Sequence, residues 1–309
     1  MRSIQDLNLA YAQSLDWILK NGDLAFPRGF TTKELISYQL GIDSSRCVLI
    51  NPVRKLSYPF MVAEWLWILF GRNDTEFVGR FNKHIGQFSD NGLNFYGAYG
   101  PRFRAQLAHV YNSLSTDPNS RQAVMTFWHQ NPEKSKDIPC TVGLHFVVRG
   151  GALHLLSWMR SNDAWLGMPY DTFNFCQLQN FLAGLLKVRR GTYVLTANSY
   201  HLYDDKFAVA QKAVEWQEPR NDNVFQPATS DILVSGGVSE YEEMCEIFNQ
   251  MVPHLLNGEL NDEAIRAVLP PGISEHVVFL NRFVRGQDHR AVKFWKEVYE
   301  LNGERPACA

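Results

Sequence analysis

The sequence lacks any run of the roughly 18 consecutive apolar residues that a membrane-spanning helix requires. It also lacks an excess of one charge, since 30 lysines and arginines accompany 32 aspartates and glutamates for a net charge of -2. A protein that binds a nucleic-acid polymer usually shows a basic face. We therefore expect neither a membrane nor a nucleic-acid polymer as partner. The start of the chain, Met1 to Asp6, has no apolar signal-peptide core, which favours a soluble, cytoplasmic protein.

Cysteine is scarce, and its spacing excludes two further classes. The five cysteines are odd in number, far apart and free of paired metal-binding spacing: Cys47, Cys140, Cys176, Cys245 and Cys308. This pattern indicates reduced thiols rather than a disulfide framework, and it predicts no metal site. The composition, 45% hydrophobic and 13% aromatic, is typical of a packed globular protein.

The spacing of apolar residues predicts an α+β fold, a mixed sheet packed with helices, whose last third is helical. Helices are expected over 3–21, 58–70, 171–187, 205–217, 240–256, 262–268 and 287–301. Strands are expected in two pieces within 34–50, and over 122–129, 141–149, 152–159 and 191–199. Gly150-Gly151 predicts a hairpin, whereas 219–230 and 270–272 are expected to be loops. No linker interrupts the chain, so we expect one domain over 1–309, with a divergent, largely helical portion over about 207–309.

One part of the chain concentrates residues of chemical interest. Pro139-Cys140 opens an alternating strand, Arg160-Ser161-Asn162-Asp163 closes the next, and Leu166-Gly167-Met168-Pro169-Tyr170-Asp171 leads into a helix. His201-Leu202-Tyr203 follows later. These segments resemble the folate-dependent thymidylate synthases and their pyrimidine hydroxymethylase relatives, over roughly residues 26–206. The resemblance implies the mixed sheet of that family, with a helical C-terminal extension that it does not cover.

Cys140 is the candidate nucleophile. A thiolate is the reactive form, and a nearby guanidinium lowers the pKa of a thiol, so we expect Arg160 to activate it. The resemblance implies that the thiolate adds to C6 of a pyrimidine nucleotide and that C5 then takes a one-carbon unit from methylenetetrahydrofolate. Cys47, Cys176 and Cys245 are expected to be buried structural thiols instead.

Asp171 is the candidate base-recognising residue, because the resemblance places that role at its position, where uracil-using members carry asparagine. Uracil offers a donor at N3 and an acceptor at O4, whereas cytosine offers an acceptor at N3 and a donor at N4. A carboxylate accepts a hydrogen bond from N4, so Asp171 favours cytosine. The alternative is that Asp171 only caps the helix predicted over 171–187.

Two further residues are candidates for proton transfer. Glu64 is the one carboxylate in an otherwise apolar predicted helix, and burial would raise its pKa into the range that suits acid–base catalysis. An exposed helix glutamate is the alternative. Tyr99 resembles the family tyrosine that is placed to abstract the C5 proton.

The remaining site residues are implied by the resemblance alone. They are Arg28, Arg121, Arg160 and Ser161 for the phosphate, His201 and Tyr203 for the sugar, and Asp163, Leu166, Gly167 and Tyr170 for the folate. The family counterpart of Arg121 comes from the partner subunit, which implies a homodimer with shared sites. Taken singly, each arginine is as readily explained by a surface ion pair.

Three departures from the family pattern affect the chemistry. Gln122 replaces an arginine, and Thr141 stands where a histidine is usual. The stretch His84-Ile85-Gly86-Gln87-Phe88 lacks the tryptophan that synthases place against the folate. A missing aromatic shield would admit water to the methylene intermediate, which favours a hydroxymethyl product over a methyl product.

The sequence therefore predicts a cytidylate 5-hydroxymethylase, with dCMP ahead of CMP as substrate, methylenetetrahydrofolate as co-substrate and no metal. A cytidylate C5-methyltransferase, a thymidylate synthase and a catalytically silent nucleotide-binding homologue are the alternatives. A cysteine protease is disfavoured, because no matching histidine and asparagine context accompanies the thiol.

Overall fold

The computed structural model describes residues 6–217 and 228–303. Cys308, residues 3–5 of the first predicted helix and most of the predicted loop 219–230 therefore lie outside the described residues. Within those two ranges, no helix combines the length and the apolarity needed to cross a bilayer.

The centre of the molecule is a mixed sheet in the order β1-β2-β7-β5-β4-β3, with β6 paired to β7. The strands are β1 (Asp23–Ala25), β2 (Thr32–Asp43), β3 (Val124–Thr126), β4 (Thr141–Arg149), β5 (Ala152–Met159), β6 (Asn162–Asp163) and β7 (Arg189–Tyr203). Most neighbours are antiparallel, but β5 and β6 run parallel to β7. The parallel pairing requires a crossover between β5 and β7, and this crossover contains the long helix of the candidate site.

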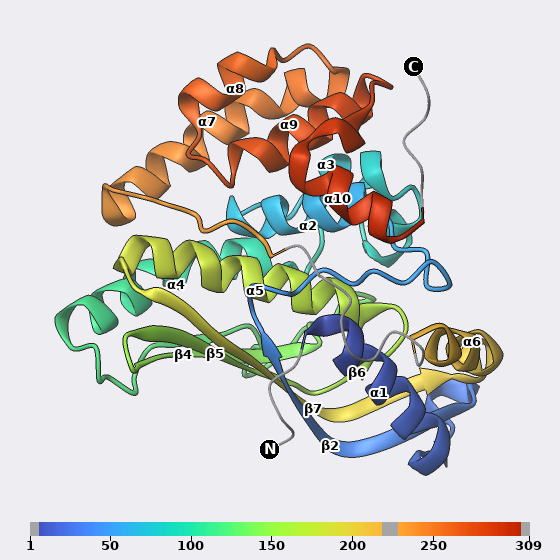
Figure 1. Ribbon diagram of the computed structural model, residues 1–309. Coiled ribbons are helices and arrows are strands. Elements are labelled where there is room, and N and C mark those ends of the chain that lie inside the picture. The colour runs from blue at the N-terminus through green and yellow to red at the C-terminus, as the bar shows by residue number, and fades with distance from the viewer. Residues whose placement is uncertain (1–5, 218–227, 304–309) are drawn as a thin grey trace.

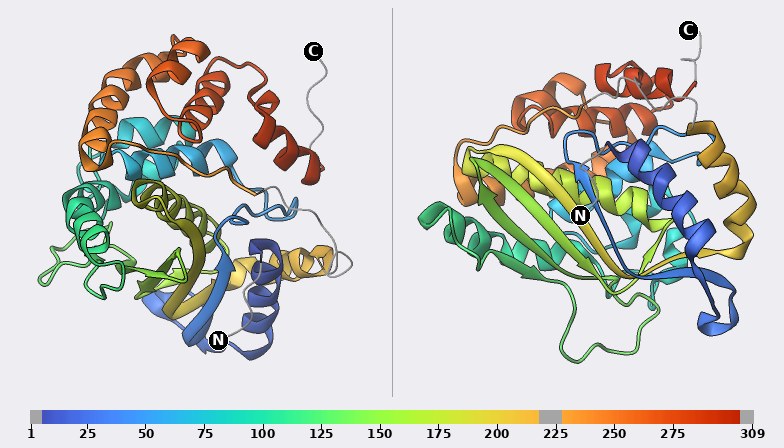
Figure 2. Two further views of the ribbon diagram at one scale, coloured as in Figure 1. Left: turned by 60° about the vertical axis from the view of Figure 1, so that its left-hand side comes forward. Right: turned by 60° about the horizontal axis from the view of Figure 1, so that its bottom comes forward.

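Helices cover the sheet in successive layers (Figure 1). They are α1 (Leu7–Asn21), α2 (Tyr58–Leu69), α3 (Thr75–Phe81), α4 (Tyr99–Thr116), α5 (Gly167–Leu186), α6 (Phe207–Gln217), α7 (Gly237–Asn257), α8 (Asp262–Val268), α9 (Ser274–Val284) and α10 (Lys293–Leu301). Helix α5 contacts β5 and β7, α2 packs on α5, and α9 packs on α2. Figure 2 shows the same order from two other directions, with the C-terminal helices farthest from the strands. The predicted α+β class is confirmed.

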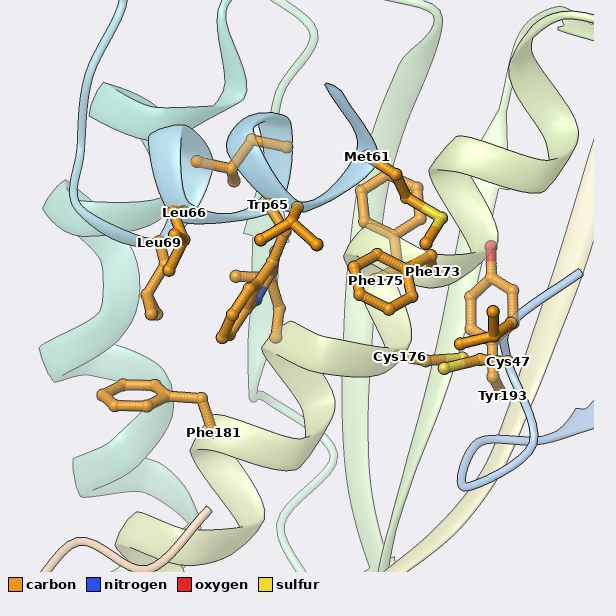
Figure 3. Close-up of a cluster of buried hydrophobic side chains, with 14 of the residues drawn as sticks. Cys47, Met61, Trp65, Leu66, Leu69, Phe173, Phe175, Cys176, Phe181 and Tyr193 are labelled. Carbon is orange, nitrogen blue, oxygen red and sulfur yellow. The ribbon is translucent and has the colours of Figure 1, made fainter. Parts of the chain in front are cut away.

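A cluster of aromatic and sulfur-containing side chains fills the space between α2, α5 and the sheet (Figure 3). Trp65 of α2, Phe173 and Cys176 of α5, and Tyr193 of β7 are all fully buried. Cys47 and Cys245 are also buried, as expected for structural thiols. This packing fixes α5 on the sheet, so the side chains at its N-terminal end are held in place.

Several predicted boundaries are wrong. The chain after Asp43 is not a second strand. The backbone of Val48 and Ile50 bonds instead to the buried side-chain amide of Asn8. This amide donates to the Val48 carbonyl (3.1 Å) and accepts from the Ile50 N–H (2.6 Å). The strand expected over 122–129 shortens to Val124–Thr126, and helices α3, α4 and α9 were not expected. That residues 1–309 form one domain stays a prediction.

Candidate active site

A cavity of about 180 Å³ lies between α2, α4, α5 and the start of β4. Among its lining residues are Glu64 of α2, Tyr99 at the first position of α4, Cys140 immediately before β4, and Asp171 of α5. The structure thus brings together the four residues that the sequence singled out for chemistry. They come from four separate elements, so only the fold makes them neighbours.

The Cys140 thiol is held beside Arg160. The Arg160 guanidinium donates from Nε to the Pro139 carbonyl (2.8 Å) and from Nη2 to the Ile138 carbonyl (2.9 Å). Nη2 also lies 3.8 Å from Cys140 Sγ. Arg160 lowers the pKa of the Cys140 thiol, as expected, but it is not the larger influence. Burial raises the pKa of the Cys140 thiol, and Arg160 only partly opposes that rise.

Asp171 lies inside α5 rather than at its start. The helix begins at Gly167, with Pro169 in its first turn, where no backbone N–H is needed for an intrahelical hydrogen bond. The predicted boundary at 171 and the helix-cap alternative are therefore both wrong. One carboxyl oxygen, Oδ2, accepts a hydrogen bond from Asn162 Nδ2 at 2.8 Å. Burial, followed by the nearby Glu64, raises the pKa of Asp171 to about 8.

Glu64 has a similar arrangement on the opposite wall. Its Oε2 accepts from Asn174 Nδ2 at 2.8 Å, and burial raises the pKa of Glu64 to about 7 despite that hydrogen bond. Asn174 lies one helical turn after Asp171, so the two residues share a face of α5. The sequence reasoning missed Asn174, although its i,i+3 spacing from Asp171 was a usable signal. Two weakly acidic carboxyls, each with an asparagine partner, therefore share the cavity.

The raised pKa of Asp171 predicts how stability depends on pH. An unfolded carboxyl titrates near 3.8, whereas the folded one titrates near about 8. Between these values the folded protein holds a proton that the unfolded chain has lost, so the unfolding free energy falls as pH rises. As pH rises from about 4 to about 8, we expect Asp171→Asn to gain stability relative to the parent protein in urea unfolding. Equal pH dependence in both proteins would contradict the raised value.

Tyr99 and Thr141 form a pair at the edge of the cavity. The Tyr99 hydroxyl accepts from the Thr141 N–H (3.2 Å) and lies 3.0 Å from the Thr141 hydroxyl, which donates to it. Burial raises the pKa of Tyr99 well above its ordinary value, and the nearby Asp171 and Cys140 add to that rise. Thr141, a departure from the family pattern, therefore holds a phenol that faces both the thiol and the acid.

A second group of predicted residues lies along β6, β7 and the turn before β2. The hydroxyl of Ser161 lies 3.5 Å from His201 Nδ1, and Arg28 Nη2 lies 3.4 Å from the Tyr203 hydroxyl. The Arg28 backbone is left-handed, with φ 53°, a conformation that a non-glycine residue rarely adopts. These four residues therefore form neighbouring polar pairs outside the cavity lining.

The remaining predictions are not gathered at the cavity. Arg121 lies between α4 and β3 and lines a different, polar hollow with His109 and Gln122. Asp163 accepts from the backbone N–H groups of Trp165 and Leu166. The Tyr170 hydroxyl accepts from the Ser57 N–H. Asp163 therefore has a local structural contact, whereas Tyr170 ties α5 to the segment before α2.

The cavity also contains residues that the sequence did not single out. Asp137 lines it and accepts from the Gly97 N–H at 2.7 Å. Ile85 and Phe88, from the short helix Ile85–Phe88, form part of an apolar wall. The stretch 84–88 carries no tryptophan, as the sequence shows, but the expected lack of an aromatic wall is corrected, because the half-exposed ring of Phe88 and the indole of Trp67 both line the cavity. No group of three or more potential metal ligands occurs in the parts of the chain that the structure describes.

Comparison with known proteins gives two concordant findings. The sequence model of the thymidylate synthase family matches residues 9–228. The chain is 35% identical over 234 residues to a deoxyuridylate hydroxymethyltransferase of Bacillus phage SP01, covering 64% of this chain and 57% of the relative. It is 32% identical over 156 residues to a deoxyuridylate hydroxymethyltransferase of Pseudomonas phage M6, covering 47% and 44%. The chain therefore spans about half the length of these curated relatives.

Proposed function

The chain belongs to the thymidylate synthase family, and from that premise we propose that it hydroxymethylates C5 of a cytidine monophosphate. dCMP is the favoured substrate and CMP the second. The observation that carries the proposal is the common cavity of Cys140 and Asp171. A nucleophile and an acidic base-recognising group are thereby available to the same small ring.

In this proposal Cys140 adds to C6 of the base. The thiol must lose its proton against a raised pKa, and the Arg160 guanidinium, 3.8 Å from Sγ, stabilises the thiolate. Tyr99 and Glu64 line the same cavity and are placed to move protons at C5 and at the exocyclic group. The raised pKa of Glu64, about 7, suits that task near neutral pH.

Methylenetetrahydrofolate, the co-substrate of the family, supplies the one-carbon unit when bound. The apolar side of the cavity, which includes Phe60, Ile85 and Phe88, fits a flat ring system. We propose Asp163, Leu166, Gly167 and Tyr170 as further folate contacts. The Leu166 side chain is 54% exposed and therefore available. No metal has a part in this proposal.

Hydroxymethylation rather than methylation is supported by the names of the two phage relatives. It also agrees with the exposure of Phe88, which is 47% exposed, because this side of the cavity is then accessible to water.

Those names also make deoxyuridylate a third candidate substrate. The printed activity of both relatives concerns the uracil base, whereas Asp171 favours cytosine. The proposal is tested by incubating the protein with methylenetetrahydrofolate and dCMP, CMP or dUMP separately and weighing the products. We expect hydroxymethyl-dCMP. Methyl products would point to the methyltransferase alternative, and release of the C5 hydrogen from none of the three would support a silent homologue.

We further propose a cytoplasmic homodimer in which Arg121 completes the partner's phosphate site. Two features support the dimer: Arg121 lies away from its own cavity, and apolar side chains of neighbouring strands are exposed. These are Val124 of β3 (38%), and Leu156 (38%) and Trp158 (51%) of β5. His145 of β4 pairs with both Val124 and Leu156, so the exposed residues span three adjacent strands.

Mixing two inactive variants tests the shared site. Cys140→Ser lacks the nucleophile and Arg121→Ala lacks the donated arginine, so a mixed dimer holds one complete site and one doubly impaired site. After random reassortment of equal amounts, we expect about a quarter of the wild-type activity. Two preparations mixed without subunit exchange serve as the control. Absence of any recovery after proven exchange would place Arg121 in its own subunit's site or outside it.

A further inference from the structure

Asn162 is a buried amide with an unusual set of partners. Its side chain is 2% exposed and lies on β6, next to the N-terminal end of α5. Nδ2 donates to Asp171 Oδ2 at 2.8 Å and also lies 3.3 Å from the sulfur of Met159, a weak acceptor. Both contacts require the NH2 group on this side. The amide orientation therefore does not depend on the acid alone.

The other end of the amide has no such role. Asn162 Oδ1 is buried and has no hydrogen-bond partner within the described residues. A buried acceptor without a partner costs free energy of folding, so the side chain is poorly suited to a purely structural task. Its one strong contact in the described part of the chain is the one to Asp171.

Gly167 lies beside the hydrogen-bonded pair of Asn162 and Asp171, and its lack of a side chain leaves room for them. A Cβ added at Gly167 would lie 3.2 Å from Asp171 Oδ2 and 3.6 Å from Asn162 Nδ2. Oδ2 is thus the carboxyl oxygen that lies toward Asn162 and the backbone of Gly167. The two carboxyl oxygens of Asp171 are therefore not equivalent.

This difference matters because a neutral carboxyl has one donor and one acceptor, in either order. With the proton on one oxygen the group complements the N3 acceptor and N4 donor of cytosine. With the proton on the other oxygen it complements the N3 donor and O4 acceptor of uracil, as an amide does. An N–H directed at one oxygen keeps that oxygen an acceptor.

We propose, on the basis of the proposed function, that Asn162 is a positioning residue that selects the base by fixing the Asp171 proton on Oδ1. With this order fixed, the carboxyl can form both hydrogen bonds with only one of the two bases. The other base would place donor against donor and acceptor against acceptor. A mainly neutral Asp171 is consistent with its raised pKa. The titratable groups around it are Glu64 from α2, Tyr99 from α4, Asp163 from β6, Tyr193 from β7 and the Cys140 thiol.

The test is the ratio of kcat/KM for dCMP to kcat/KM for dUMP in Asn162→Ala. Without the amide the proton is free to occupy either oxygen, so we expect the ratio to move toward one by at least about tenfold, whichever base the parent protein prefers. Asn162→Ser retains a donor and should keep part of the selectivity. A ratio within about twofold of the parent value in Asn162→Ala would overturn the inference.

Asn174→Ala is the matched control, because it removes the equivalent amide from Glu64 instead of Asp171. We expect it to lower turnover with both nucleotides and leave the ratio unchanged. A ratio that shifts equally in both variants would also overturn the inference. Failure of the proposed function is distinguishable, since the parent protein would then turn over neither nucleotide. The ratio of dissociation constants from calorimetry would replace the kinetic ratio in that case.

Discussion

Replacing Cys140 with serine is expected to lower kcat by roughly 10⁴-fold or more, because the hydroxyl is a far weaker nucleophile than a thiolate beside a guanidinium. The change removes no phosphate or sugar contact. Binding of dCMP should therefore stay within about threefold of the parent value, as measured by calorimetry. Release of the C5 hydrogen as water is the direct measure of the lost addition step.

Cys245→Ala is the control for this variant, since it removes a buried thiol of α7 that does not line the cavity. It should retain turnover after correction for any loss of folded protein. Normal turnover by Cys140→Ser would remove the covalent mechanism from the account.

Asp171→Asn is expected to reverse the preference between bases. An amide has its donor and acceptor on fixed atoms. It takes the order that complements uracil when the Asn162 side chain turns and its Oδ1, which has no partner within the described residues, accepts from the new NH2 group. We expect the ratio of kcat/KM for dCMP over dUMP to fall by about 10²- to 10⁴-fold. Competition between the two nucleotides in one reaction, followed by product mass, gives this ratio.

Glu64→Gln makes the same carboxyl-to-amide change on the other wall of the cavity. It should slow the reaction with both bases and leave the preference in place, because Glu64 is proposed to move protons rather than to recognise the base. An unchanged cytosine preference in Asp171→Asn would exclude Asp171 from base recognition. A parent protein that prefers dUMP would favour deoxyuridylate as the substrate, in line with the names of the two phage relatives.

The strands that the sequence predicted best are those with local signals. The strands over 141–149 and 152–159 were expected from alternation and from Gly150-Gly151, and both glycines adopt positive φ in the hairpin. The expected strand after Asp43 failed because Asn8, distant in the sequence, satisfies its backbone groups. Helix α4 was missed because Gly100-Pro101 near its start suggests a turn, although proline is tolerated in a first helical turn.

In the candidate site, too, the sequence indicated some features and missed those that depend on packing. The resemblance pointed to Cys140, Glu64, Tyr99 and Asp171, which line one cavity. It gave no indication of Asn162 or Asn174, because their importance lies in single hydrogen bonds to the two acids. Nor did it reveal that burial outweighs Arg160 at the thiol. Contacts and burial depend on the packing of several elements, and the one local signal was the i,i+3 spacing of Asp171 and Asn174.

The central claim is that Cys140 attacks a cytosine ring held by Asp171, and covalent trapping tests it most directly. A 5-fluoro-dCMP base cannot lose the C5 substituent as a proton, so the protein, methylenetetrahydrofolate and this analogue should remain joined. We predict a stable adduct whose mass maps, after digestion, to the peptide that contains Cys140. An adduct that forms with 5-fluoro-dUMP but not with 5-fluoro-dCMP, or one located on another cysteine, would contradict the account.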